Sequence, residues 1–315
     1  MSWPRDIAVL CGGVGASRFL RGLARVFENE RITAIVNTGD DIVLNGLHIS
    51  PDVDIVLYTL AGLIDDVKGW GIKGDTFTCL KAMGKLGMQT WFALGDRDLA
   101  THVFRTKLMR EGRKPSQVTR ILAERLGVKV RVVPMTDDRF ETRVRTPSGW
   151  MHFQEYLVKR RMRERITGLA FAGAGRARPA PGVISAIKGS DLLIIPPSNP
   201  IVSVGTILSL RGVKTAIKRR KRPIVAISPV IGGRVIKGPL ARMMRHKGLK
   251  VTSLSVAAIY RDLLDGFVLD NCDSRYAQDL QRMGIAPYLT DVLMPDVRAS
   301  VRLAEETLEF SRTLA

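Results

Sequence analysis

The sequence predicts an α/β fold, an open and mainly parallel sheet with helices on both faces. Short apolar runs of strand length alternate with amphipathic segments of helix length along the 315-residue chain. Several of these apolar runs end directly in loops rich in glycine, proline or polar residues. Because ligands bind beyond the carboxyl ends of the strands in such sheets, we expect these loops to form one site.

The first strand, DIAVLC at residues 6–11, leads into a glycine-rich turn, and residues 17–27 carry apolar side chains at helical spacing. Glycines at a helix N-terminus can present backbone N–H groups to a phosphate. The spacing departs from G-x-G-x-x-G because Arg18 replaces the third glycine. A phosphate-binding loop and a purely structural tight turn are both compatible with this pattern. The glycines concerned are Gly12, Gly13 and Gly15.

Further strands and helices follow in alternation. Four apolar runs have strand length: TAIV at 33–36, WFAL at 91–94, LLII at 192–195 and IVAI at 224–227. Helical spacing is found at 98–110, 116–126 and 203–219. This order favours strands that run parallel and are joined by helical crossovers.

Between about residues 135 and 190 the pattern changes. A hairpin is expected with its turn at Thr146–Gly149, followed by a basic stretch and by a segment rich in glycine, alanine and proline at 172–182. We interpret 135–190 as an inserted hairpin and helical lobe that covers the active site. The whole chain, residues 1–315, is then expected to form a single domain.

Four aspartates gather between residues 37 and 54, directly after the second strand. Carboxylate oxygens are hard ligands that suit Mg²⁺, which usually bridges one or two protein carboxylates to substrate phosphates. A structural role is the alternative, because Asp41 can cap a turn and Asp52 follows Pro51, a common turn arrangement. The four acids are Asp40, Asp41, Asp52 and Asp54.

Two other loops combine polar groups at expected strand ends. Asp96 and Arg97 place an acid and a base after the run at 91–94, and Ser198 and Asn199 place a hydroxyl and an amide after the run at 192–195. Either loop can simply cap the helix that follows it. Binding and capping therefore both stay open for these residues.

The chain is strongly basic, with 49 Lys and Arg against 30 Asp and Glu and a formal net charge of +19. Such a charge attracts polyanions, including nucleic acid, and also small phosphorylated ligands. The basic run at 218–222 has no aromatic residue beside it, which favours a solvated helix end over a nucleic-acid patch. A basic nucleic-acid-binding protein is nevertheless one alternative function.

A nicotinamide-dependent oxidoreductase is the other alternative. The incomplete glycine fingerprint counts against it, as does the lack of a ribose-binding acid at the end of the second strand, where Asn37 begins a turn. The three cysteines are far apart and lack metal-ligand spacing, which predicts a reducing compartment. With no run of ~18 apolar residues, we expect a cytoplasmic protein without a membrane partner.

Several stretches taken together resemble one family, the 2-phospho-L-lactate transferases of coenzyme F420 biosynthesis (CofD). The resemblance covers nearly the whole chain in the same order. Its main stretches are GGVGASRFLRGL, NTGDDIVLNGLHISPDVDIVLYTLAGLID, GWGIKGDTF, LGDRDLATHVFRT, HFQEY, PPSNPIVSVG and SPVIGG.

The resemblance implies a Rossmann-like fold and a Mg²⁺-dependent transfer. A phospholactyl, phosphoenolpyruvyl or phosphoglyceryl group would pass from a guanosine-diphosphate-linked donor to the deazaflavin FO, and GMP would leave. The product would be F420-0 or its dehydro or 3-phosphoglyceryl form. Relatives also suggest a homodimer, and no nucleic-acid partner is expected.

The resemblance also implies roles for particular residues. Asp40 and Asp54 would be catalytic and hold Mg²⁺, although Asp54 could instead lie beside the attacking hydroxyl as a base. Asp96 would belong to the ligand-binding set, and Arg97 would help to place FO or screen phosphate charge. The donor's guanosine and phosphates would be cradled by Gly12, Gly13, Gly15, Ser198 and Asn199. The chain departs from many relatives at Ala16-Ser17-Arg18, so no particular phosphate is assigned to Arg18.

Overall fold

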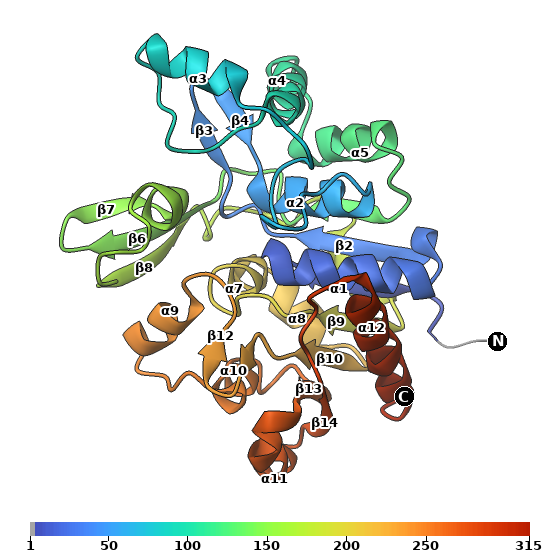
Figure 1. Ribbon diagram of the computed structural model, residues 1–315. Coiled ribbons are helices and arrows are strands. Elements are labelled where there is room, and N and C mark those ends of the chain that lie inside the picture. The colour runs from blue at the N-terminus through green and yellow to red at the C-terminus, as the bar shows by residue number, and fades with distance from the viewer. Residues whose placement is uncertain (1–3) are drawn as a thin grey trace.

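The computed structural model describes residues 4–315 and confirms the α/β prediction (Figure 1). Its centre is a seven-stranded sheet in which every neighbouring pair of strands runs parallel. Strands buried on both faces read as continuous apolar runs, which is why the sequence revealed several of them. In spatial order the strands are β14 (Ala286–Thr290), β13 (Gly266–Asp270), β10 (Ile224–Ile227), β9 (Leu192–Ile195), β1 (Ile7–Cys11), β2 (Ile32–Val36) and β5 (Arg131–Pro134).

Helices pack on both faces of this sheet and bury two separate apolar cores. Alternate residues of β1 enter opposite cores, Val9 on one face and Leu10 on the other. One face is covered by α1 (Gly13–Val26), α2 (Pro51–Leu60), α5 (Pro115–Arg125) and α12 (Val297–Arg312). The other core receives α6 (Val183–Gly189), α7 (Val204–Ser209), α8 (Val213–Lys218), α9 (Leu240–His246), α10 (Ser253–Ile259) and α11 (Ala277–Arg282).

Helices α1 and α12 cross at very short range. A Cβ built on Gly22 of α1 would lie 2.0 Å from the carbonyl oxygen of Ser300 on α12. The glycine is therefore needed for close packing of the C-terminal helix.

Among residues 4–315, none of the helices is long and apolar enough to span a membrane.

The chain changes direction across the sheet between β1 and β9. It first adds β2 and β5 on one side of β1, then returns to place β9 on the other side and continues outward through β10, β13 and β14. The loops after β1 and β9 consequently diverge and leave a crevice at the carboxyl ends of these strands. The glycine turn at 12–15 and the loop at 197–199 meet in this crevice.

A second small unit contains β3 (Ile42–Leu44), β4 (Leu47–Ile49), α3 (Thr78–Lys85) and α4 (Asp96–Arg110). The strand expected at 91–94 is wrong, because the described structure has no strand there. Trp91, Phe92 and Leu94 instead pack beside β3, β4 and α4 in a separate apolar cluster. The helix expected at 203–219 is two helices, α7 and α8, with Gly212 between them in the left-handed region at φ 85°.

The predicted hairpin is confirmed as β6 (Glu141–Thr146) and β7 (Gly149–His152), and β8 (Gly168–Ala172) completes a three-stranded antiparallel sheet. It contacts the acid-rich loop, since the Thr142 N–H donates to Gly39 O at 2.7 Å and His152 Nε2 lies 3.0 Å from Asp41 O. The short remaining elements are η1 (Asn29–Arg31), the π-helical turn η2 (Glu155–Lys159), β11 (Val230–Ile231), β12 (Arg234–Val235) and η3 (Asn271–Tyr276).

Candidate active site

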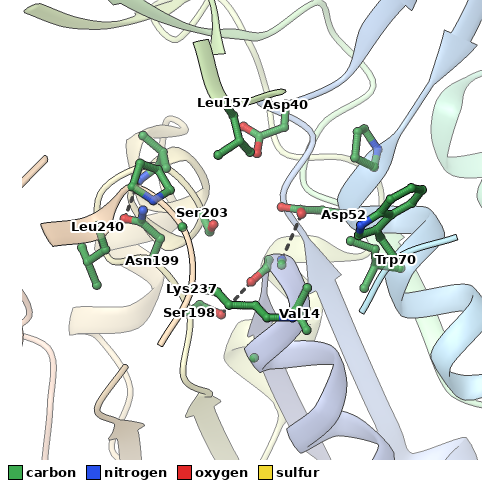
Figure 2. Close-up of a pocket in the computed structure, with 18 of the residues that line it drawn as sticks. Val14, Asp40, Asp52, Trp70, Leu157, Ser198, Asn199, Ser203, Lys237 and Leu240 are labelled. Carbon is green, nitrogen blue, oxygen red and sulfur yellow. Dashed lines mark hydrogen bonds between the residues drawn. The ribbon is translucent and has the colours of Figure 1, made fainter. Parts of the chain in front are cut away.

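A cavity of about 480 Å³ lies beyond the carboxyl ends of β1 and β9, within the range of small-molecule sites (Figure 2). The glycine turn, the acid-rich loop and the first turn of α2 line the cavity. Residues of η2 and the preceding turn, Phe153, Gln154 and Leu157, also line it, as does the loop after β12. The crevice predicted from strand order is therefore a real cavity.

Asp40 points into this cavity from the acid-rich loop, and Asp52 from the first turn of α2 (Figure 2). Asp52 Oδ1 accepts the Gly13 N–H at 3.0 Å, and its Oδ2 accepts the Asn37 side-chain amide at 2.8 Å. These two bonds attach the start of α2 to the glycine turn and to the end of β2. Asp40 Oδ1 is buried and has no hydrogen-bond partner among residues 4–315.

Both carboxyl groups are difficult to ionise. Burial is the largest cause that raises the pKa of Asp40 well above its usual range, and repulsion from Asp52 adds to it. Burial also raises the pKa of Asp52 to about 6, although the bonds from Asn37 and Gly13 work in the opposite direction. Within residues 4–315, no positive charge compensates either acid.

This pair fits Mg²⁺. No group of three His, Cys, Asp or Glu side chains within residues 4–315 is arranged to hold a metal by itself. Mg²⁺ does not need one, since it usually takes one or two carboxylates and completes its shell with water and substrate phosphates. The uncompensated Asp40 and Asp52 offer that donor set beside the glycine turn.

Asp54 is held quite differently. The guanidinium of Arg105 donates from Nη1 to Asp54 Oδ2 at 3.0 Å and from Nη2 to Oδ1, so the buried carboxylate carries its own counter-ion. Helical residues two apart do not face the same way, because each residue turns the helix by about 100°. Asp52 and Asp54 of α2 consequently meet different partners. The geometry joins Asp40 to Asp52, and the metal role of Asp54 stays a prediction.

The loops predicted to cradle the donor do meet at the cavity, but their side chains also fold the loops. Ser198 Oγ donates to Gly12 O at 3.1 Å, and Asn199 Oδ1 accepts the backbone N–H of Ile201 at 2.9 Å. A Cβ at Gly15 would stand 2.2 Å from the carbonyl oxygen of Pro197. The glycine turn therefore has the structural role considered from sequence, and its ligand role stays a prediction.

Asp96 and Arg97 are absent from the described residues that line the cavity. Asp96 accepts the backbone N–H groups of Thr78 at 3.1 Å and Cys79 at 2.9 Å, so it caps the start of α3. Arg97 donates from Nη1 to the Lys73 carbonyl at 3.3 Å. Asp96 therefore caps the preceding helix α3 and not the following helix as expected from sequence, and the structure does not bring either residue to the other predicted site residues.

Sequence reasoning missed several cavity residues. Trp70 and Lys237 line the cavity from loops far apart in sequence, and Lys237 Nζ donates to the Lys68 carbonyl at 3.5 Å, which joins these two loops. His102 lines it from the middle of α4. The glycine-rich stretch IGGRVIKG was the available signal for Lys237, whereas helical spacing made His102 look like an ordinary helix residue.

The basic run at 218–222 begins at the last residue of α8, which supports the helix-end interpretation. Arg220 donates from Nη2 to Ser190 O at 3.0 Å, and Arg222 forms an ion pair with Asp191. Lys218 Nζ lies 3.4 Å from Asp262 Oδ2. Three of the five cations thus have partners within the fold.

Comparison with known proteins identifies a family and full-length relatives. The family model described as 2-phospho-L-lactate transferase CofD matches residues 7–306. A phosphoenolpyruvate transferase of Streptomyces griseus is 41% identical over 311 residues, covering 97% of this chain and 98% of its own length. A 2-phospho-L-lactate transferase of Methanocaldococcus jannaschii is 38% identical over 312 residues, covering 98% of this chain and 99% of its own length.

A solved structure supports the fold. A protein of the upf0052 family from Bacillus halodurans superposes with a TM-score of 0.66 over 97% of this chain and 99% of that chain, at 16% sequence identity. The solved structure shows the fold alone. The family match and the full-length relatives also show the family, because they cover both the sheet and the cavity loops. The chain belongs to the 2-phospho-L-lactate transferase family, CofD.

Proposed function

We propose that this protein transfers a phosphorylated three-carbon acid from a guanosine-diphosphate-linked donor to the deazaflavin FO, with release of GMP. The observation that carries the proposal is the pair Asp40 and Asp52, two buried and uncompensated carboxylates beside a glycine turn. Relatives named phosphoenolpyruvate transferase and 2-phospho-L-lactate transferase support the class of reaction.

The cavity offers two different walls on either side of these acids. Figure 2 places Trp70 on one side and Asn199 and Ser203 on the other. The N-terminus of α1 and the glycine turn give N–H groups, and Lys237, whose Nζ reaches the Lys68 carbonyl, adds positive charge to the cavity lining; both suit the donor's phosphates. Trp70 gives the first side aromatic surface, which suits the flat ring system of FO, and Phe92 adds a second aromatic ring to the cavity lining.

In the proposed reaction a hydroxyl oxygen of the FO side chain attacks the phosphorus that carries the three-carbon acid. A new phosphorus–oxygen bond forms, and the bond between this phosphorus and the GMP oxygen breaks. The hydroxyl proton passes to Asp54, which lines the cavity, and GMP leaves with the electron pair of the broken bond. Catalysis then depends mainly on position and charge, as in other phosphoryl transfers.

Mg²⁺ held by Asp40 and Asp52 would neutralise phosphate charge when bound. The chain's own residues have separate tasks. The glycine turn keeps Asp52 in place, and Lys237 adds a positive charge to the cavity lining. The apolar residues of the lining exclude water from the reacting groups. Homodimer formation and a cytoplasmic location stay predictions.

The test is incubation of the purified protein with FO, Mg²⁺ and one donor per reaction, using guanylylated phospholactate, phosphoenolpyruvate and phosphoglycerate. The amount of deazaflavin product, measured by mass spectrometry, and the amount of GMP, measured by chromatography, are expected to rise together in at least one reaction. Reactions with excess EDTA serve as the control. A folded protein that makes no deazaflavin product from any of the three donors would contradict the proposal.

A further inference from the structure

We propose that Arg105 and His102 of α4 are positioning residues that hold the Asp54 carboxylate in the orientation used for transfer, a role that rests on the proposed function. Both residues are buried, with exposed fractions of 3% and 1%. Arg105 is absent from the described cavity lining, whereas Asp54 and His102 belong to it. Arg105 would therefore act through Asp54 rather than on a substrate.

The contacts form a chain from α2 into α4 and back. The Tyr58 hydroxyl donates to Asp98 Oδ1 at 2.7 Å, and His102 Nε2 lies 3.2 Å from the same oxygen without the alignment of a full hydrogen bond. His102 Nδ1 lies 3.0 Å from Arg105 Nη1. Arg105 then binds both oxygens of Asp54.

This geometry fixes the protonation pattern of the His102 ring. A guanidinium has donors and no acceptor, so Nδ1 must accept the hydrogen from Arg105 Nη1. The remaining ring proton then belongs to Nε2, which faces Asp98. His102 thereby binds Nη1 of the Arg105 guanidinium, and Nη1 and Nη2 together bind the two oxygens of Asp54.

The ion pair itself keeps its charge. Burial opposes the cation, but attraction to Asp54 raises the pKa of Arg105 above its usual value. Replacing a buried ion pair by apolar residues is often neutral or stabilising, so stability alone gives little reason for this arrangement. The position of Asp54 in the cavity lining gives a functional reason, because a carboxylate oxygen can accept a further hydrogen bond beyond that from Arg105. Holding that acceptor still avoids reorganisation during transfer.

A matched pair of substitutions separates the two sides of His102. In His102→Asn the amide oxygen can replace Nδ1 as the acceptor for Arg105. In His102→Gln the longer amide reaches towards Asp98 and leaves no group at the Nδ1 position. We expect His102→Asn to keep kcat within about threefold and His102→Gln to lower it about tenfold or more, with KM for FO nearly unchanged in both.

A double-mutant cycle tests whether the effect passes through Asp54. If it does, adding His102→Gln to Asp54→Asn should lower kcat no further than Asp54→Asn alone. Equal losses of kcat in the Asn and Gln variants would overturn the proposal. So would full additivity in the cycle, or a Gln variant that loses thermal stability but keeps kcat.

Nitrogen NMR of the imidazole gives a readout that does not need turnover. The chain has four histidines, so the His102 signals can be assigned by their loss in either variant. We expect the ring hydrogen on Nε2, with Nδ1 bare and accepting from Arg105. A proton on Nδ1 would overturn the proposed arrangement, whereas the expected ring in a protein that makes no product would refute the transfer function alone.

Discussion

Replacing Asp52 by Asn should change the pH dependence of folding in a defined direction. The folded-state pKa of Asp52 is raised from 3.8 to about 6, chiefly by burial. A group with a raised folded pKa contributes stability that is fully present below its unfolded pKa and lost as pH rises through its folded pKa. The relevant window for the metal-free protein therefore runs from about pH 4 to somewhat above pH 6.

The size of the effect follows from the shift. A change of roughly two pKa units at 1.36 kcal/mol per unit corresponds to about 3 kcal/mol. Urea unfolding of EDTA-treated wild type and Asp52→Asn, from about pH 4 to about pH 8, measures it as a difference between two free energies of unfolding. Taking the difference cancels the titrating groups that Asp52 does not influence, whereas Asp40, whose pKa Asp52 helps to raise, contributes to the measured difference. A difference that stays flat, or that favours the wild type more at higher pH, would refute the reasoning.

Mg²⁺ provides the second half of the same experiment. Because cation binding requires ionised carboxylates, Mg²⁺ should stabilise the wild type at about pH 8 and have little effect at about pH 5. At 100 times its Kd it should add about 2.7 kcal/mol to the free energy of unfolding. Asp40→Asn is the matched control, since it removes an acid whose Oδ1 has no hydrogen-bond partner among the described residues, and its response to Mg²⁺ should be much smaller. An undiminished response would remove Asp40 from the metal site.

Three other substitutions have defined outcomes. Asp54→Asn should lower kcat roughly 100-fold while FO binding by fluorescence persists, and an unchanged kcat would exclude Asp54 as proton acceptor. Gly22→Ala should destabilise the fold by about 2 kcal/mol in urea, because its Cβ meets Ser300. Gly189→Ala is its control, since its Cβ meets no described atom within 4 Å, and equal losses would argue against the clash. Lys237→Ala should raise KM for the donor about tenfold with kcat little changed, and steady-state kinetics showing an unaltered KM would contradict its phosphate contact.

Four of the five inner strands could be predicted because burial on both faces leaves a continuous apolar run, whereas β13 was missed although it too is fully buried. β1, β9 and β10 show that signal in full. The edge strands could not be found in the same way, since β14 is largely half-exposed along one edge and β5 contains Pro134 at its end. Trp91–Leu94 gave a false strand because an apolar run of that length shows only that it is buried, not what it packs against.

The site was predictable to the level of the loop but not of the individual acid. The run of aspartates indicated the chemistry, whereas the pairing depends on where α2 begins. Pro51 is the first residue of that helix, and this start sends Asp52 to the glycine turn and Asp54 to Arg105. Asp96 gave a similar signal from sequence, but its position sets it beneath the start of α3. Such differences arise from tertiary contacts that no local pattern contains.

The acids gathered in this basic chain differ in how the fold compensates them. Asp54 has a guanidinium, Asp52 has two N–H donors, and Asp40 Oδ1 has no hydrogen-bond partner among the described residues. A net charge of +19 spread over the chain does not neutralise a buried carboxylate, because the interaction depends on local distance and dielectric. The deficit at Asp40 and Asp52 must therefore be met by protonation or by a cation that arrives with the substrates. Only cation binding leaves both carboxylates ionised, and the cation that they hold can then bind a phosphate. The proposed site therefore combines Mg²⁺ with an anionic donor.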